Sequence, residues 1–173
     1  MGLIHIYCGD GKGKTTAAFG LALRAAGSGM KVHIVQLMKG NETSELNSLE
    51  KLDGITLSRC DKNYGFTFRM TEQERNEITL CHNRILNEAY DLMQSGSIDM
   101  LIIDEFDPAY HHGLLEKKLA EKLVFEKPEK IELILTGRYP DEKFLECADY
   151  VSEIKSVKHP FLSGIKARKG IEF

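Results

Sequence analysis

A glycine-rich motif between an apolar run and a helical pattern constrains the fold of this chain more than any other feature. Residues 3–8 read as a buried strand, and residues 14–26 repeat alanine and leucine at helical spacing before Gly27-Ser28-Gly29 ends the pattern. In a strand-loop-helix unit, glycines let backbone N–H groups turn inward around phosphate oxygens, a lysine adds positive charge and a hydroxyl can bind Mg²⁺. The motif therefore predicts a phosphate loop made of Gly9, Asp10, Gly11, Lys12, Gly13, Lys14, Thr15 and Thr16.

The phosphate loop is a variant of the usual pattern G-x-x-x-x-G-K-[ST]. The strict pattern places its first glycine at position 8, where this chain has Cys8, so that glycine is displaced by one residue to Gly9. The alternative interpretation is a glycine-rich turn without function. The Gly13-Lys14-Thr15 ending, together with the flanking strand and helix, favours a phosphate site.

Strand-like and helical patterns continue to alternate along the chain, which is typical of an α/β protein with a mainly parallel sheet. Thr71 and Glu74 have the capping-box spacing that opens the longest of these helices. At roughly 150 residues per domain, we expect one P-loop NTPase-like (RecA-like) domain over residues 1–173, with about six strands flanked by helices. Further strands are predicted at 31–37, 55–59, 98–103, 131–135 and 150–154, a short helix within 39–48, and helices at 71–94, 114–125 and 141–147.

Charge and cysteine usage narrow the class of protein. Lysine and arginine number 23 against 26 acidic residues, for a net charge of −3, so we expect no nucleic-acid partner and no anionic-membrane surface. No apolar run approaches the roughly 18 residues of a membrane span, and the first residues lack the order of a signal peptide. The cysteines show no CxxC pair, so we expect neither a zinc site nor a disulfide framework, and we expect a cytoplasmic protein; they are Cys8, Cys60, Cys81 and Cys147.

Polar side chains follow two of the predicted strands at their carboxyl ends. Asp104-Glu105 ends one apolar strand and Thr136-Gly137-Arg138 ends another. Ligands of open α/β sheets collect at this edge, where both segments would meet the phosphate loop. We therefore expect Thr15, Asp104 and Glu105 to hold a Mg²⁺ (or Mn²⁺) ion and Arg138 to bind ATP. The alternatives are a helix-capping or solvated acidic pair, and an arginine that is only surface charge.

An aromatic segment at residues 63–68 raises a separate question. Phe66 and Phe68 lie two residues apart, a spacing that would put both rings on one side of an extended segment. Such rings either form a lid on a flat ligand or belong to a satellite core. The adjacent His111 and His112 do not predict a metal site, because neighbouring histidines point apart on a helix and have no third partner nearby.

With these motifs in place, the chain closely resembles the P-loop family of ATP:cob(I)alamin adenosyltransferases, also called corrinoid adenosyltransferases. The resemblance runs from the first strand to the last residue, and its C-terminal part has no counterpart in ordinary P-loop NTPases. The chain departs from the family at Phe68, where a tryptophan is frequent. The matching segments are 9–18, 35–40, 65–68, 104–105, 136–138, 148–153, 158–161, 164–167 and 170–173.

The resemblance implies an activity and its partners. The 5′-deoxyadenosyl group of ATP would be transferred to the Co(I) of cob(I)alamin or another reduced corrinoid, giving adenosylcobalamin or an adenosylcorrinoid and inorganic triphosphate. A reduced flavoprotein would supply electrons, and the protein would form a homodimer. The implied catalytic residues are Lys14, Glu105, Phe66 and Phe68, with the two rings on the lower face of the corrin.

Two other classes of function share the phosphate loop. A P-loop kinase or ATPase would cleave the β–γ bond and release ADP or phosphate instead of triphosphate. A nucleotide- or corrinoid-binding module without catalysis would bind tightly and form no new cobalt–carbon bond.

Overall fold

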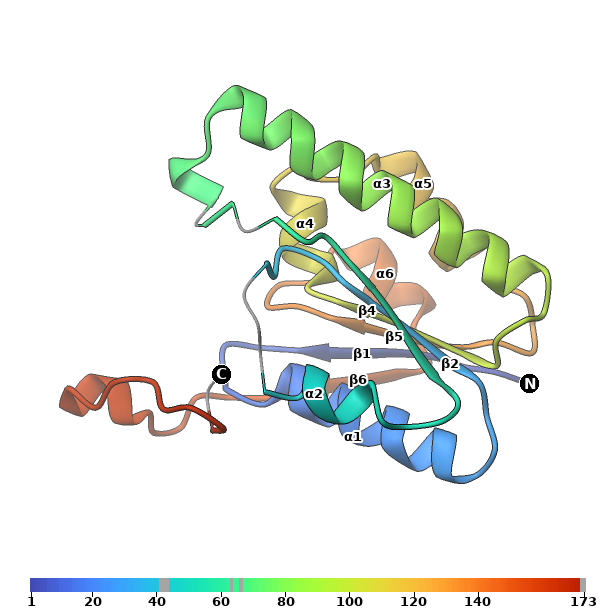
Figure 1. Cartoon of the computed structure of the whole chain (residues 1–173), viewed down its shortest axis with the longest axis horizontal. Coiled ribbons are helices and arrows are strands. Elements are labelled where there is room, and N and C mark those ends of the chain that lie inside the picture. The colour runs from blue at the N-terminus through green and yellow to red at the C-terminus, as the bar shows by residue number, and fades with distance from the viewer. Residues whose placement is uncertain (41–43, 63, 66, 172–173) are drawn as a thin grey trace.

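The computed structural model describes residues 1–40, 44–62, 64–65 and 67–171, and these residues form a six-stranded sheet between two layers of helices (Figure 1). Every strand pairs parallel to its neighbours, in the order β3-β2-β4-β5-β1-β6. The predicted P-loop NTPase-like α/β sheet is confirmed. The strands are β1 (Ile4–Cys8), β2 (Val32–Gln36), β3 (Ile55–Arg59), β4 (Met100–Asp104), β5 (Glu132–Thr136) and β6 (Tyr150–Glu153).

Helices cover both faces of the sheet, which explains why its central strands are apolar almost throughout. Along β2 and β4, Val35 and Ile103 pack on one face while Ile34 and Ile102 pack on the other, and all four are fully buried. One face carries α1 (Lys14–Gly27) and α2 (Leu46–Leu49). The other carries α3 (Glu72–Gln94), α4 (Phe106–His111), α5 (Lys117–Phe125) and α6 (Glu142–Cys147).

The predicted elements agree with the observed ones apart from two helices. Thr71 caps α3 by accepting a hydrogen bond from the Glu74 N–H, and the Glu74 carboxylate accepts one from the Thr71 N–H, so the capping box is confirmed. The chain forms α4 directly after Glu105, where no helix was predicted; Pro108 is accommodated because it lies in the first turn, whose N–H groups need no partner within the helix. The helix predicted from residue 114 begins at Lys117.

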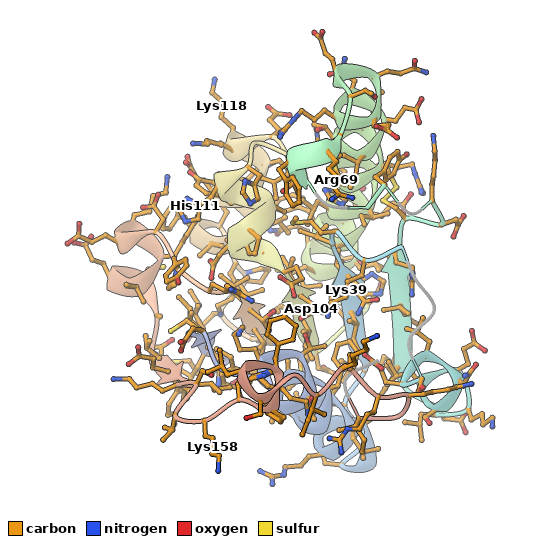
Figure 2. The ribbon with its side chains drawn as sticks, turned by 90° about the vertical axis from the view of Figure 1, so that its left-hand side faces the viewer. Lys39, Arg69, Asp104, His111, Lys118 and Lys158 are labelled. Atoms are coloured by element: carbon orange, nitrogen blue, oxygen red, sulfur yellow. A yellow bond between two sulfur atoms is a disulfide. The ribbon has the colours of Figure 1, made fainter. Side chains whose placement is uncertain are left out.

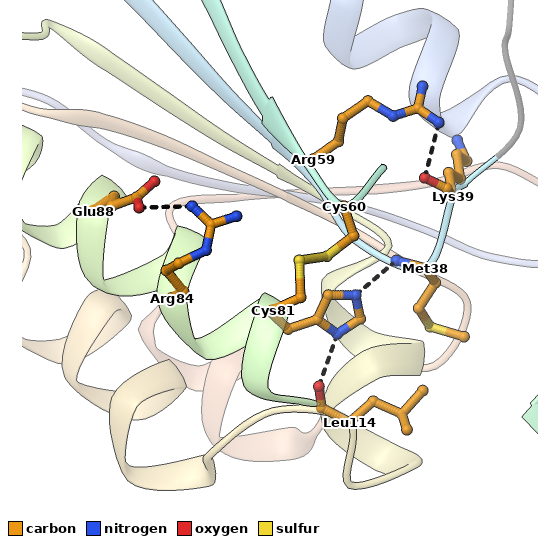
Figure 3. The surroundings of a disulfide bond; sticks show 9 residues. Met38, Lys39, Arg59, Cys60, Cys81, Arg84, Glu88 and Leu114 are labelled. Carbon is orange, nitrogen blue, oxygen red and sulfur yellow. Dashed lines mark hydrogen bonds and ion pairs between the residues drawn. A yellow bond between two sulfur atoms is a disulfide. The ribbon is translucent and has the colours of Figure 1, made fainter. Parts of the chain in front are cut away.

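A disulfide joins Cys60, just after β3, to Cys81 in α3, so the expectation of no disulfide is wrong (Figure 3). The two cysteines lie 21 residues apart in the sequence, a separation that matches no cysteine motif. They meet because α3 packs across β2 and β3. Cys8 and Cys147 are free thiols.

Reducing this disulfide is expected to lower the free energy of unfolding by roughly 3 kcal/mol, because the bond closes a loop of about twenty residues in the unfolded chain. Urea denaturation with and without a reductant measures the change. The double variant Cys60→Ser and Cys81→Ser serves as a control, because its stability should not respond to the reductant. A wild-type midpoint that does not move on reduction would contradict the crosslink.

The C-terminal segment leaves the sheet edge at β6, projects away from the other elements and then turns back toward them (Figure 1). Its short 3₁₀ helix spans Pro160–Ser163, and Val157, Phe161 and Leu162 are exposed. Within the described part of the chain, no helix has the length and apolar character needed to cross a membrane.

Candidate active site

The phosphate loop connects β1 to α1 at the carboxyl edge of the sheet. Gly9 has φ 103°, in the left-handed region, and its N–H donates to the Arg138 carbonyl at 3.1 Å. The Gly11 N–H donates to the Ile154 carbonyl at 2.8 Å. A Cβ atom at Gly9 would overlap the Ile154 carbonyl oxygen, so the loop requires glycine where it crosses the end of β6.

Lys14 lies at the start of α1 with its ammonium group folded into the phosphate loop. Its Nζ donates to the carbonyl oxygens of Gly9 at 2.7 Å and Gly11 at 2.8 Å. Partial burial lowers the pKa of the Lys14 ammonium, and the positive charge of Arg138 lowers it further. Both acceptors are neutral carbonyl oxygens. An incoming phosphate is a negatively charged acceptor, so it can form a stronger hydrogen bond with the Lys14 ammonium and replace them.

A buried carboxylate, Asp104 at the end of β4, organises the residues beside the phosphate loop. Its Oδ1 accepts hydrogen bonds from the hydroxyls of Thr15 at 2.9 Å and Thr136 at 2.7 Å. Its Oδ2 accepts from the Lys39 ammonium at 2.7 Å and from Gln36 Nε2 at 3.4 Å. Asp104 is fully buried, so these donors replace the water that a carboxylate normally requires.

Glu105 occupies an unusual backbone position between β4 and α4. Its φ of 60° is left-handed, a strained conformation for a residue with a side chain, and such strain is concentrated at functional sites. The Glu105 N–H donates to Thr136 Oγ1 at 3.0 Å, and its carboxylate lies 3.8 Å from the Lys39 ammonium. Burial raises the pKa of the Glu105 carboxyl, and the neighbouring Asp104 carboxylate raises it further.

Lys39 belongs to this cluster although the sequence did not mark it as a site residue. It follows β2, which pairs with β4, so its side chain reaches Asp104 across the edge of the sheet (Figure 2). Its Nζ also donates to Thr15 Oγ1 at 2.9 Å. In the sequence Lys39 stands out only in a Lys39-Gly40 pair directly after a strand, inside the matching segment 35–40, and neither feature predicts such a contact.

The donors fit a Mg²⁺ or Mn²⁺ ion. Thr15 supplies a hydroxyl oxygen and Asp104 and Glu105 supply carboxylate oxygens, which are the ligands that these hard ions prefer. Thr15 and Asp104 already share one positive charge, the Lys39 ammonium, so the position attracts cations. Within the described residues no group of three or more His, Cys, Asp or Glu side chains could hold a metal ion by itself.

A pocket of about 870 Å³ opens beside the phosphate loop. Its polar end is the loop, and its apolar wall includes Phe19 and Leu23 of α1 and Leu49 and Leu52 at α2. The C-terminal segment closes one side through His159 and Ile171. Every residue predicted to bind ATP lines the pocket except Gly9, whose carbonyl instead holds Lys14; those that line it are Asp10, Gly11, Lys12, Gly13, Lys14, Thr15, Thr16 and Arg138.

Phe68 lies outside this pocket, in a 3₁₀ helix at Thr67–Arg69, so the expected extended conformation is wrong there. Arg75 of α3 fixes that helix by donating to the Thr67 carbonyl at 3.3 Å. Phe68 is 76% exposed, which contradicts a satellite core, and the lid interpretation stays a prediction. In the view onto the carboxyl edge, Arg69 lies above Lys39 and Asp104 (Figure 2). Phe66 lies outside the described residues.

Asp107 is a buried carboxyl group beside the site that the sequence did not single out. It is 2% exposed, and its Oδ2 has no hydrogen-bond partner among the described residues. Gly137 makes room for it, since a Cβ atom there would overlap the Asp107 carboxylate. Burial raises the pKa of Asp107 from 3.8 to about 7, with Glu105 and Asp141 adding to the rise and His111 opposing it.

Replacing Asp107 by asparagine is expected to stabilise the protein increasingly as the pH rises. The folded pKa lies above the unfolded value, so wild-type stability falls between about pH 4 and pH 7, where only the unfolded chain has lost its proton. At about 1.4 kcal/mol per pKa unit, the full penalty that Asp107→Asn removes above pH 7 is roughly 4 kcal/mol. Urea denaturation at pH 5 and pH 8 measures the gain, and an equal gain at both values would contradict a buried, protonated Asp107.

Comparison with known proteins decides the family. The family model described as ATP:corrinoid adenosyltransferase BtuR/CobO/CobP matches residues 1–173. The chain belongs to this family. It is 36% identical to the corrinoid adenosyltransferase of Escherichia coli strain K12 over 172 residues, which cover 99% of this chain and 86% of that one.

Two further corrinoid adenosyltransferases show the same extent of similarity. The enzyme of Salmonella typhimurium strain LT2 is 34% identical over 99% of this chain and 86% of its own. That of Pseudomonas aeruginosa PAO1 is 32% identical over 99% of this chain and 84% of its own. The resemblance found in the motifs is confirmed, and the chain is an enzyme of the ATP:corrinoid adenosyltransferase family.

A solved structure supports the fold independently of the family. A KaiC-like protein from Pyrococcus horikoshii OT3 superposes with a TM-score of 0.56, covering 88% of this chain and 71% of that one. The two sequences are 17% identical, so the likeness concerns the P-loop NTPase-like fold alone.

Proposed function

We propose that this chain transfers the 5′-deoxyadenosyl group of ATP to the Co(I) of a reduced corrinoid and releases inorganic triphosphate. The observation that supports this most is the position of Lys14, folded into the phosphate loop beside the Thr15-Asp104-Glu105 cluster, in a chain that matches the family over its whole length. Cobalamin and earlier corrinoids share the reacting cobalt, and the proposal covers both.

The phosphate loop has the task of stabilising the leaving group. When the bond between the ribose 5′ carbon and its oxygen breaks, the electron pair leaves with the triphosphate, and negative charge increases on its oxygens. Lys14, whose ammonium is folded into the loop, and Arg138 both line the pocket and bring positive charge to that position. Preorganised donors of this kind stabilise developing charge without rearranging during the reaction.

We propose that a divalent cation binds beside this loop, where these oxygen donors lie. Thr15, Asp104 and Glu105 would hold it, and its chemistry when bound is the neutralisation of phosphate charge. Thr136 fixes the two acids, because its hydroxyl donates to Asp104 and accepts from the Glu105 N–H.

No protein side chain needs to act as a nucleophile or a general base, because Co(I) is itself a strong nucleophile. The enzyme therefore has to place the 5′ carbon in line between cobalt and the leaving oxygen. The ribose must face the corrin, so the nucleotide lies reversed relative to ATP in a γ-phosphate transferase.

Formation of Co(I) is the second task assigned to the enzyme. Loss of the lower axial ligand from Co(II) raises its reduction potential, and an aromatic ring on that face favours the four-coordinate form. The exposed ring of Phe68, together with Phe66, is suited to that position. A reduced flavoprotein is the proposed electron donor, and a homodimer is the proposed assembly.

The identity of the phosphate product tests this function. The protein is incubated without oxygen with Mg-ATP and chemically reduced cobalamin, the visible spectrum is followed, and the phosphate species are separated. We expect a cobalt–carbon spectrum and one triphosphate per adenosyl group. ADP or phosphate would indicate a kinase or ATPase, and binding without a new spectrum would indicate a non-catalytic module; either result overturns the proposal.

A further inference from the structure

Lys39 is the one residue of the described site whose role the transfer reaction leaves unexplained. Its ammonium lies between Thr15 Oγ1 at 2.9 Å and Asp104 Oδ2 at 2.7 Å, with a Glu105 oxygen at 3.8 Å. These are the three side chains that would hold a divalent cation. The ammonium therefore occupies the position that a metal ion needs.

The backbone around Lys39 is built to place this side chain. Met38 has φ 58°, a left-handed conformation that costs about 1 kcal/mol or more without compensation. The buried His82 of α3 compensates, because its Nε2 accepts from the Met38 N–H at 3.1 Å while its Nδ1 donates to the Leu114 carbonyl at 2.7 Å (Figure 3). Arg59 donates to the Lys39 carbonyl at 3.1 Å from the other side.

We propose that Lys39 is an internal counter-ion: it neutralises the Thr15-Asp104-Glu105 cluster while no nucleotide is bound, and it moves onto the polyphosphate when ATP arrives with its metal ion. The first half follows from the contacts above. The second half rests on the proposed function, because it needs a polyphosphate in the loop.

Charge balance supports the exchange. Asp104 is fully buried, and an unpaired carboxylate there would be costly, so the nucleotide-free protein needs a cation of its own. A metal ion and an ammonium group repel each other strongly at such short separation, so both cannot remain on Asp104. The lysine side chain is long, flexible and 26% exposed, and it lines the same pocket as the phosphate loop.

This role predicts opposite effects of one substitution on two ligands. Lys39→Met should bind Mn²⁺ alone at least about tenfold more tightly than wild type, because the competing charge is gone. The same variant should bind Mg-triphosphate about tenfold more weakly, because one phosphate contact is lost. Mn²⁺ binding is measured by electron paramagnetic resonance without nucleotide, and Mg-triphosphate binding by calorimetry.

Three further variants make the test specific. Lys39→Gln keeps a donor for Asp104 without the charge, and it should reproduce the Mn²⁺ result even if Lys39→Met folds poorly. Lys39→Arg keeps the charge and should keep the wild-type Mn²⁺ affinity. Lys31→Met removes an exposed lysine at the opposite end of β2 and should change neither affinity.

Two results would overturn the inference. Unchanged or weaker Mn²⁺ binding by both neutral variants would show that Lys39 does not occupy the cation position. Unchanged Mg-triphosphate binding would show that its ammonium does not move to the phosphates. Both measurements omit the corrinoid, so they are independent of whether the wild-type protein forms a cobalt–carbon bond.

Discussion

Replacing Lys14 by alanine is expected to reduce the rate of adenosyl transfer by at least about 10²–10³-fold, the range found when a preorganised donor to developing charge is removed. The lysine ammonium is held inside the phosphate loop by two carbonyl oxygens and is the charged group best placed to follow the leaving triphosphate. The rate of cobalt–carbon bond formation from pre-reduced cobalamin and Mg-ATP measures the loss. Because that assay starts from Co(I), the electron-transfer step does not enter.

A control separates this effect from damage to the fold. Lys31→Ala removes an exposed lysine at the far end of the sheet and should leave the rate unchanged. The two lost hydrogen bonds are to carbonyls of the buried residues Gly9 and Gly11, at a cost of about 1–3 kcal/mol each, so the unfolding midpoint of Lys14→Ala is measured beside its rate to show that the variant is folded. A Lys14→Ala protein that is folded and as active as wild type would refute the assignment of the phosphate loop.

The sheet could be predicted because its strands leave a strong and local signal. Burial from both sides makes β4 a nearly continuous apolar run and keeps most of β2 and β5 apolar, and the glycines around α1 mark both of its ends. Helix α4 could not be predicted, because it is six residues long and contains Pro108. The disulfide could not be predicted either. The contact between Cys60 and Cys81 depends on how α3 crosses β3, and the number of residues between the two cysteines does not indicate that they pair.

Site residues could be predicted where they belong to one continuous segment or lie at the carboxyl end of a predicted strand. Asp104, Glu105 and the phosphate loop meet because parallel strands end at the same edge, and Thr15 does contact Asp104. The places of Lys39 and Asp107 at the site could be found only from the structure. The role of Lys39 depends on its contact with a neighbouring strand, and the raised pKa of Asp107 depends on the packing that buries it.

Replacing Phe68 by alanine is expected to slow turnover by at least about tenfold when the reaction starts from Co(II), and by less than about threefold when it starts from pre-reduced Co(I). The reason is that an exposed ring can cover the lower face of the corrin and stabilise the four-coordinate form, which matters for reduction and not for alkylation. Tryptophan would keep an aromatic ring at this position, so Phe68→Trp should retain the Co(II) reaction.

The ratio between the two starting states is the decisive quantity, because damage to the nucleotide site would slow both reactions equally. Leu80→Ala provides a matched control: this α3 side chain is 71% exposed, nearly as much as Phe68 at 76%, and its loss should leave both rates unchanged. Phe66→Ala should show the same selective loss as Phe68→Ala if the two rings act together. Equal losses of rate from Co(II) and from Co(I) in both phenylalanine variants would contradict a role of the aromatic segment in reduction. They would indicate that the segment contributes only to binding the corrinoid.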